Sequence, residues 1–187
     1  MLAALMALAV PLNGNSGCAT TGNSKSDEPE SPASVYKSTL ALLTDAEEAE
    51  KRIDYKKLFD GFSRACALGT EQGQPHAAAC FNAGLAAAKR GRNDDAAGYY
   101  RQALAADPGL QAAAQNLTVA LLASGKSEEA LPIYEDYLNS NSGDLDMVNN
   151  YAGALSEAGR TTDAVLQIQK LLYKDPKNTR AYKTLAR

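Results

Sequence analysis

Few side chains in this 187-residue sequence are of types that could do chemistry, and they lie far apart. The single histidine, His76, follows Pro75 and has no second histidine with which to share a metal ion or a proton. We expect it to be a solvated loop residue. The sequence contains no phosphate-binding loop, no nucleophile motif and no nucleotide-binding fingerprint. We therefore expect no catalytic residue, no metal, no cofactor and no small-molecule substrate, and a protein that is not an enzyme.

Acidic residues gather in three short runs, which are Asp94-Asp95, Glu128-Glu129 and Asp45-Ala46-Glu47-Glu48. Carboxylates are favourable in the first turn of a helix, where they complement the backbone dipole. We interpret these runs as helix-start charges and not as catalytic pairs. The whole chain has 19 basic and 22 acidic side chains and a net charge of -3, which gives no attraction toward nucleic acid.

Cys18 follows a segment typical of exported proteins. Leu2 to Val10 is an unbroken apolar run. It is too short for a membrane span of ~20 residues and has the length of a signal-peptide core. Ser16-Gly17-Cys18 resembles the lipobox of bacterial lipoproteins, which implies cleavage before Cys18 and a lipid on that cysteine. Two departures are Asn15 at the usual leucine position and the lack of Lys or Arg before the apolar run.

The segment after Cys18 is rich in Ser, Thr, Gly, Asn, Pro and charged residues as far as Pro32. Such a composition predicts a flexible tether, residues 19–33, after a signal peptide at 1–18. The alternative is a disordered tail with a chance cysteine. No aspartate follows Cys18, and by resemblance to lipoproteins this favours the outer over the inner membrane. We thus expect a protein of the bacterial cell envelope, facing the periplasm.

The other two cysteines are Cys66 and Cys80. If Cys18 carries a lipid, they remain as an even pair, and an oxidising periplasm favours a disulfide between them. Cys66 lies near the end of one predicted helix and Cys80 near the start of the next, so the two positions face each other if the helices are antiparallel. The placement also resembles that of Sel1-like repeats, which implies a link between consecutive units. Two buried free thiols are the alternative.

The sequence repeats with a fixed period, because Gly91, Gly125 and Gly159 stand 34 residues apart. In each of the segments 77–110, 111–144 and 145–178, helix-forming residues lead to a glycine that can end a helix, and a second helical run follows. We expect N-caps at Asn93, Ser127 and Thr161. The small residues expected where the two helices approach closely are Gly84, Ala152, Ala96, Ala130 and Ala164. Repetition at this period indicates an all-α solenoid of stacked helix pairs.

Five typed positions in the first copy are Gly84, Gly91, Ala96, Tyr100 and Pro108. Their spacing resembles the tetratricopeptide repeat, which implies a right-handed superhelical solenoid of antiparallel helix pairs. The match covers about 100 of the 187 residues. The later copies depart from the pattern at Thr118, Tyr137, Ser142, Ile168 and Leu171. We expect a repeat domain over 34–187, with a divergent leading repeat at 34–76 and helices near 33–50 and 54–68. A partial repeat at 179–187 stops in mid-helix, which favours a fragment of a longer array.

The resemblance places a partner-binding groove on the inner helices, at the second, fifth, sixth, ninth and thirteenth positions of each unit. These are Ala78, Phe81, Asn82, Leu85 and Lys89, then Ala112, Gln115, Asn116, Val119 and Ala123, then Asp146, Asn149, Asn150, Gly153 and Glu157. Phe81 is the expected anchor, with the inter-repeat core as its alternative. Carboxylate-clamp relatives carry lysine at the fifth position. This chain has Phe81, Gln115 and Asn149 there, so we do not expect a bound C-terminal carboxylate.

These observations together predict a membrane-anchored scaffold that recruits a protein or peptide partner in the cell envelope through a concave helical surface. A partner segment that is apolar at one end and polar or basic at the other would suit the groove. One alternative is a Sel1-like enzyme that binds cell-wall ligands or β-lactams. Another is a soluble adaptor that carries no lipid.

Overall fold

The computed structural model describes residues 30–48 and 52–185, which form helices and no strand. The helices are α1 (Pro32–Glu48), α2 (Tyr55–Glu71), α3 (Ala77–Lys89), α4 (Asn93–Ala106), α5 (Gln111–Ala123), α6 (Ser127–Ser140), α7 (Leu145–Glu157), α8 (Thr161–Lys174) and α9 (Thr179–Leu185). The predicted helical solenoid is confirmed. The predicted signal peptide, residues 1–18 with Cys18, lies outside the described residues, as does the tether up to residue 29.

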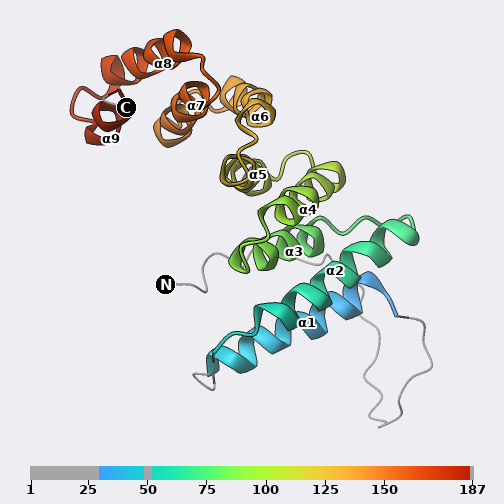
Figure 1. Ribbon diagram of the computed structural model, residues 1–187. Helices are drawn as coiled ribbons and strands as arrows, with labels where there is room; N and C mark the ends of the chain where they lie inside the picture. The colour runs from blue at the N-terminus through green and yellow to red at the C-terminus, as the bar shows by residue number, and fades with distance from the viewer. Residues whose placement is uncertain (1–29, 49–51, 186–187) are drawn as a thin grey trace.

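Each helix packs against the next along the chain, and α7 also packs against α9. Figure 1 shows the pairs stepping from α1 and α2 at one end to α8 and α9 at the other along a curved path. From α3 onward the odd-numbered helices lie on the inner side of the curve and the even-numbered helices on the outer side (Figure 1). Two different surfaces are therefore available, one inside and one outside the curve.

The turn within each repeat is made by the periodic glycine. Gly91, Gly125 and Gly159 have φ angles of 73°, 71° and 76°, in the left-handed region where a side chain would be strained. The predicted N-caps are wrong by one position, because Asn93, Ser127 and Thr161 are the first residues inside α4, α6 and α8. The residues before them make no side-chain capping bond. The tight glycine turn places Arg92, Lys126 and Arg160 at the cap positions.

Gly84 lets the helices of the first repeat approach closely. A Cβ atom at Gly84 would lie only 2.6 Å from Cε1 of Tyr100, so α3 and α4 could not keep this spacing with a larger residue. The other small residues predicted at helix contacts, Ala96, Ala130, Ala152 and Ala164, are all buried. The steric reason given for the small residues therefore holds.

The leading pair α1 and α2 is more regular than its sequence suggests. Gly61 lets α2 approach α1 closely, because a Cβ there would overlap the buried side chain of Thr39 on α1. Asp45 corrects the interpretation of one acidic run. It lies near the C-terminal end of α1, which extends from Pro32 to Glu48, and not at a helix start. The acidic pairs at 94–95 and 128–129 do lie in first turns, as predicted.

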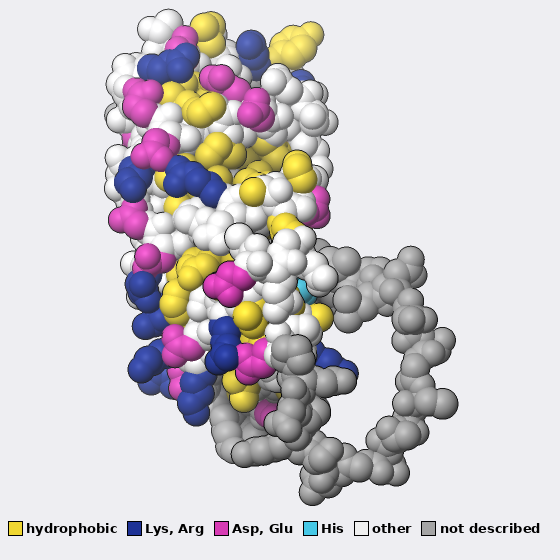
Figure 2. Space-filling view, turned by 90° about the vertical axis from the view of Figure 1, so that its right-hand side faces the viewer, with side chains coloured by type: hydrophobic (Ala, Val, Ile, Leu, Met, Phe, Trp, Pro, Cys, Tyr) yellow, Lys and Arg dark blue, Asp and Glu magenta, His cyan; other side chains and the backbone are white. Residues whose placement is uncertain are grey.

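Ion pairs join the outer helices of successive repeats. Lys126 contacts Asp94 at 2.8 Å, and Arg101 on α4 contacts Glu129 on α6 at 2.6 Å. Figure 2 shows positive and negative side chains alternating down one edge of the molecule. All four groups are exposed to solvent, so each pair contributes little stability by itself and chiefly fixes the register between repeats.

Candidate functional site

A hollow of about 450 Å³ lies on the inner side of the curve, between α5, α7 and α9. We call the inward surface of these three helices the inner groove. Four of the predicted partner-binding residues line the hollow, and these are Asn149, Asn150, Gly153 and Glu157. Leu122, Ser156, Arg180, Lys183 and Thr184 complete its lining. The third repeat therefore supplies a real concave site where the prediction placed one.

Contacts with α9 determine how the groove residues of α7 are presented. Arg180 pairs with Asp146 at 3.1 Å and donates a 2.6 Å hydrogen bond to Oδ1 of Asn150. The hydroxyl of Thr184 donates a 3.1 Å hydrogen bond to Oδ1 of the buried Asn149. These bonds use the amide oxygens, and of the two asparagines only Asn150 is partly exposed, so its amide NH₂ group is the one left to donate to a bound main chain. The sequence prediction did not include Arg180 or Thr184, which lie in the partial repeat.

The lining of the hollow carries both positive and negative charge. Lys183 on α9 and Glu157 on α7 both line it. Oε2 of Glu157 accepts a 3.1 Å hydrogen bond from the Ser127 hydroxyl, which fixes the carboxylate. Gly153 also lines the hollow, and a Cβ there would meet no atom within 4 Å, so the space above it is open. The site is polar and of mixed charge, which suits a polypeptide main chain more than a purely apolar ligand.

The second repeat contributes one exposed apolar residue to the inner groove. Val119 is 56% exposed, although a valine gains by burial. Gln115 is partly withdrawn from the groove, since its Nε2 donates to the Tyr137 hydroxyl at 3.0 Å, and that hydroxyl in turn donates to Oδ2 of Asp144 at 3.0 Å. Burial, together with the bond to Asp144, raises the pKa of Tyr137. Gln115 is thus mainly a link between α5, α6 and the start of α7.

The first repeat does not present the groove that the sequence predicted. Phe81, Asn82 and Leu85 are buried, with exposures of 3%, 2% and 8%. The Phe81 ring packs 5.8 Å from that of Tyr100, so Phe81 belongs to the core and the prediction of an exposed anchor is wrong. Asn82 is covered by Tyr36 of α1, to whose hydroxyl it donates a 2.9 Å hydrogen bond. Ala78 is half-buried and Lys89 is exposed at the end of α3.

His76 also differs from its prediction as a solvated loop residue. It is the N-cap of α3, where its Nδ1 accepts a 3.2 Å hydrogen bond from the backbone nitrogen of Ala79. Its ring lies 4.6 Å from that of Tyr36 and is half-buried. Burial lowers the pKa of His76. His76 therefore has a structural role, in which its imidazole nitrogen caps the helix in place of the side-chain oxygen that usually does so.

Cys66 on α2 and Cys80 on α3 form a disulfide, with their Cα atoms 4.8 Å apart. The bridge joins the leading helix pair to the first repeat, as expected for cysteines at facing helix ends. Both cysteines are buried. Cys18, the proposed lipid attachment residue, lies outside the described residues.

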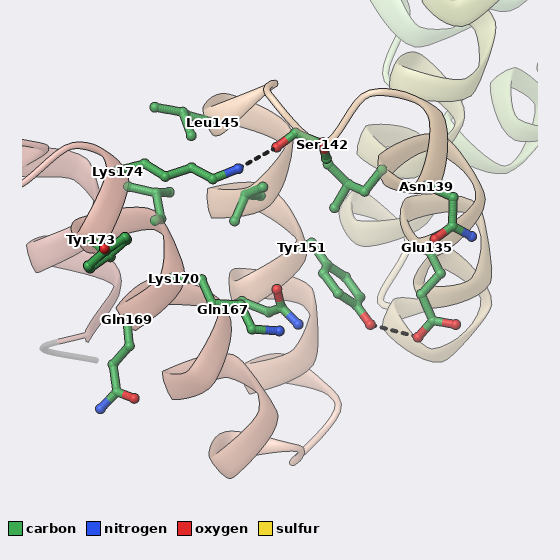
Figure 3. Close-up of a pocket in the computed structure, with 13 residues that line it drawn as sticks. Glu135, Asn139, Ser142, Leu145, Tyr151, Gln167, Gln169, Lys170, Tyr173 and Lys174 are labelled. Carbon is green, nitrogen blue, oxygen red and sulfur yellow. Dashed lines mark hydrogen bonds between the residues drawn. The ribbon is translucent and has the colours of Figure 1, made fainter.

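A larger hollow, of about 710 Å³, lies on the outer side of the curve and was not predicted. We call it the outer notch. It is lined by parts of α6, α7 and α8, with apolar residues Leu138, Leu145, Val148 and Leu171 and polar residues Glu135, Lys170 and Lys174. Figure 3 shows Tyr151 directed at Glu135 from α7 and Lys174 reaching from α8 to Ser142. No residue of the sequence signals this hollow, because it arises from the space that α6 and α8 leave over α7.

Within the described ranges, 30–48 and 52–185, no three His, Cys, Asp or Glu side chains are grouped so that they could hold a metal ion. None of the helices in those ranges combines the length and the apolar character needed to cross a bilayer.

Comparisons with known proteins identify the repeat unit. One model of the tetratricopeptide repeat matches residues 87–139 and 121–187, and a second matches 63–110. No curated protein matches the chain by sequence. Among solved structures, YrrB, described as a TPR protein with an unusual peptide-binding site, superposes with a TM-score of 0.64 at 17% identity, covering 81% of this chain and 72% of YrrB.

Two structures of MamA give similar values. MamA of AMB-1 has a TM-score of 0.63 at 15% identity over 83% of this chain and 79% of its own. MamA from Desulfovibrio magneticus RS-1 has a TM-score of 0.65 at 15% identity over 83% and 82%. At identities this low, the superpositions establish a shared fold and do not establish shared binding sites.

Proposed function

The chain belongs to the tetratricopeptide repeat family, and from that premise we propose that it is a scaffold that binds a segment of a partner protein along the inner groove. The observation that carries the proposal is the open hollow above Gly153, which is lined by the groove residues of α7 and by α9. The peptide-binding site described for YrrB, which has the same fold, supports this assignment.

The exposed groups of the inner groove indicate the chemistry of the partner segment. Val119 and the half-buried Leu122 offer an apolar contact at the α5 side. Beyond them, Asn150 and Glu157 on α7 and Lys183 on α9 offer polar and charged contacts. A segment with an apolar side chain followed by polar residues would satisfy both parts. Because the first repeat is covered by α1, the binding surface extends from α5 to α9 and not over the whole array.

Site-specific cross-linking in living cells tests the proposal. A photoreactive amino acid at Val119 should capture one discrete partner protein, whereas the same amino acid at Gly98, on the outer helix α4, should not. Gly98 is a suitable control because it is also helical and a side chain there would meet no atom within 4 Å. Equal labelling from both positions, or no adduct from Val119, would refute binding in the inner groove.

We further propose that a lipid on Cys18 holds the scaffold to a bacterial membrane, with the repeats in the periplasm and the outer membrane favoured over the inner. The support comes from the apolar run Leu2–Val10 and the lipobox-like Ser16-Gly17-Cys18. A disulfide between Cys66 and Cys80 is compatible with an oxidising compartment. Within the envelope, such a scaffold would serve the assembly of a larger protein complex.

Replacing Cys18 by serine tests the anchor. The parent protein should sediment with membranes, and the variant should be recovered in soluble or mislocalised form, because a cysteine carrying two or more acyl chains is held firmly. Mass spectrometry of the parent should show a lipid-modified Cys18 at the N-terminus. If the serine variant stays with the membrane to the same extent, Cys18 is not the anchor, and binding in the inner groove is unaffected by that result.

A further inference from the structure

The outer notch is distinct from the inner groove and has no part in the function proposed above. It lies between the outer helices α6 and α8, over the first half of α7. A smaller hollow of about 400 Å³ occupies the equivalent place one repeat earlier, between α4 and α6. There Tyr137 stands at the repeat position that Leu171 holds in the outer notch. The third repeat thus combines a smaller residue at this position with a larger hollow.

The floor of the outer notch is apolar and only partly covered. Leu138 on α6 and Leu145 and Val148 on α7 line it, and each keeps part of its side chain in contact with solvent. Apolar surface left open to water in a hollow of several hundred Å³ is typical of sites that receive an apolar side chain. An apolar side chain that entered the hollow between α6 and α8 would bury this surface.

The rim of the outer notch is positively charged. Lys170 and Lys174 are four residues apart on α8 and therefore lie on the same face of that helix. Lys174 donates a hydrogen bond to the carbonyl oxygen of Ser142 at 3.1 Å, which holds its ammonium group at the mouth. The one acid in the lining, Glu135, accepts a 2.6 Å hydrogen bond from the Tyr151 hydroxyl, which directs its carboxylate toward α7, and its single negative charge is outnumbered by the two lysines.

Few acidic side chains of α8 and α9 oppose the two lysines of the rim. Residues 161–185 contain five basic and two acidic side chains, and of the basic ones Arg180 and Lys183 line the inner groove and do not belong to this rim. Both acids are occupied: Asp163 pairs with Arg160 at 2.8 Å, and Asp175 accepts hydrogen bonds from the backbone of Lys177 and from the Asn178 side chain. An incoming acidic group would therefore meet cations and no free carboxylate of α8 or α9.

We propose that the outer notch is a second protein-binding site, which takes an acidic amphipathic segment of a partner protein. An apolar side chain of the segment fills the space over Leu138 and Val148. An aspartate or glutamate about one helical turn away pairs with Lys170 and Lys174. With the inner groove on the opposite side of the curve, the scaffold then contacts two polypeptide segments at once, which is what an assembly factor requires.

A displayed library of random peptides of about 15 residues, selected on the purified full chain, tests this site. Enriched peptides should carry an apolar residue three or four positions from Asp or Glu. For one synthesised peptide, Lys170→Glu should raise Kd by about tenfold or more, since it reverses a charge at the contact. Lys177→Glu, which changes the net charge equally outside the notch, should alter Kd by less than about twofold.

A second pair of variants separates the apolar contact from the charge. Leu138→Ala should weaken the same peptide by about fivefold or more, whereas Leu166→Ala, which truncates an exposed leucine of α8 outside the notch, should not. Thermal unfolding of all four variants identifies any loss of folding. The expected binding pattern requires that Lys170→Glu and Lys177→Glu melt as the parent does.

Four outcomes would overturn the proposal. If the selection enriches no peptide, or enriches peptides without acidic residues, the outer notch does not bind an acidic segment. Equal losses with Lys170→Glu and Lys177→Glu would indicate attraction to any anionic surface, such as vesicles of anionic lipid. A concentration-dependent dimer in sedimentation that Lys170→Glu abolishes would make a second copy of the chain the occupant. Loss of peptide binding with Gly153→Arg would place the peptide in the inner groove instead.

Discussion

Nδ2 of Asn82 on α3 donates a 2.9 Å hydrogen bond to the hydroxyl of Tyr36 on α1. The Tyr36 ring also lies 5.5 Å from the ring of Phe62 on α2 and 4.6 Å from the ring of His76, the N-cap of α3. One residue of α1 therefore contacts both α2 and α3. This contact covers α3 where the repeat pattern would otherwise expose a groove. The leading pair is therefore a cap on the array, and the inner groove begins at α5.

Phe81 and Val119 should respond in opposite ways to truncation. Phe81→Ala should lower the free energy of unfolding by about 3–5 kcal/mol, because it removes a buried ring. Val119→Ala should leave stability nearly unchanged and weaken partner capture by at least about 1 kcal/mol, because Val119 is exposed in the inner groove. Chemical denaturation and quantitative pull-down measure the two effects. The opposite pattern would restore Phe81 as a binding anchor.

Replacing two glycines on inner helices by alanine should change the free energy of unfolding in opposite directions. At Gly84 the new methyl would lie 2.6 Å from Cε1 and 2.7 Å from Cδ1 of Tyr100, so Gly84→Ala should destabilise the fold by about 1–3 kcal/mol. At Gly153 no atom lies within 4 Å, and alanine in a helix is favoured over glycine by roughly 0.5–1 kcal/mol. Urea unfolding of both variants checks this, and a stabilising Gly84→Ala would contradict the close packing of α3 on α4.

Reduction of the disulfide between Cys66 and Cys80 should destabilise the protein. The two cysteines are separated by 14 positions, and closing a loop of that size contributes about 3 kcal/mol in the chain-entropy model. Dithiothreitol should therefore lower the Tm of the parent and leave unchanged that of a variant with alanine at both positions. Ready alkylation of either cysteine in protein isolated without reductant would show that the bridge is absent.

The stability of the fold should depend on pH through His76. Burial holds the pKa of His76 below its ordinary value of 6.5, so the unfolded chain binds more protons than the folded chain as the pH falls through this region. The stability that neutral His76 contributes is fully present above pH 6.5 and is lost as the pH falls through the lowered pKa of the folded state. Protonated Nδ1 can no longer accept the hydrogen bond from the Ala79 backbone nitrogen. His76→Asn keeps an acceptor but does not titrate. Chemical denaturation between pH 7 and pH 5.5 should show a free energy of unfolding that falls with pH for the parent and stays constant for the variant.

The repeat pattern was sufficient to predict the helix pairs, the glycine turns and the small residues between helices. These features depend on local chemistry, such as the positive φ of Gly91 and the missing Cβ of Gly84. The burial of Phe81 and Asn82 could not be predicted in this way, because it depends on α1, whose sequence fits the 34-residue register poorly. Where Tyr36 would lie relative to α3 is a property of the tertiary packing.

The site was predictable to a similar degree. Asn149, Asn150, Gly153 and Glu157 line the inner groove as their repeat positions indicate. The contact between Arg180 and Asn150 could not be predicted, because it depends on how α9 packs against α7. The outer notch was missed because it arises from the space between α6 and α8, and no single residue type marks such a space.

Binding in the inner groove is tested most directly by filling it. Gly153→Arg places a long side chain in the open hollow, and Gly98→Arg places the same side chain on α4, where it also meets no atom within 4 Å. Both variants should fold as the parent does. Capture of the partner from cross-linked cells should be lost with Gly153→Arg and retained with Gly98→Arg. Undiminished capture by a folded Gly153→Arg protein would contradict recognition through the inner groove.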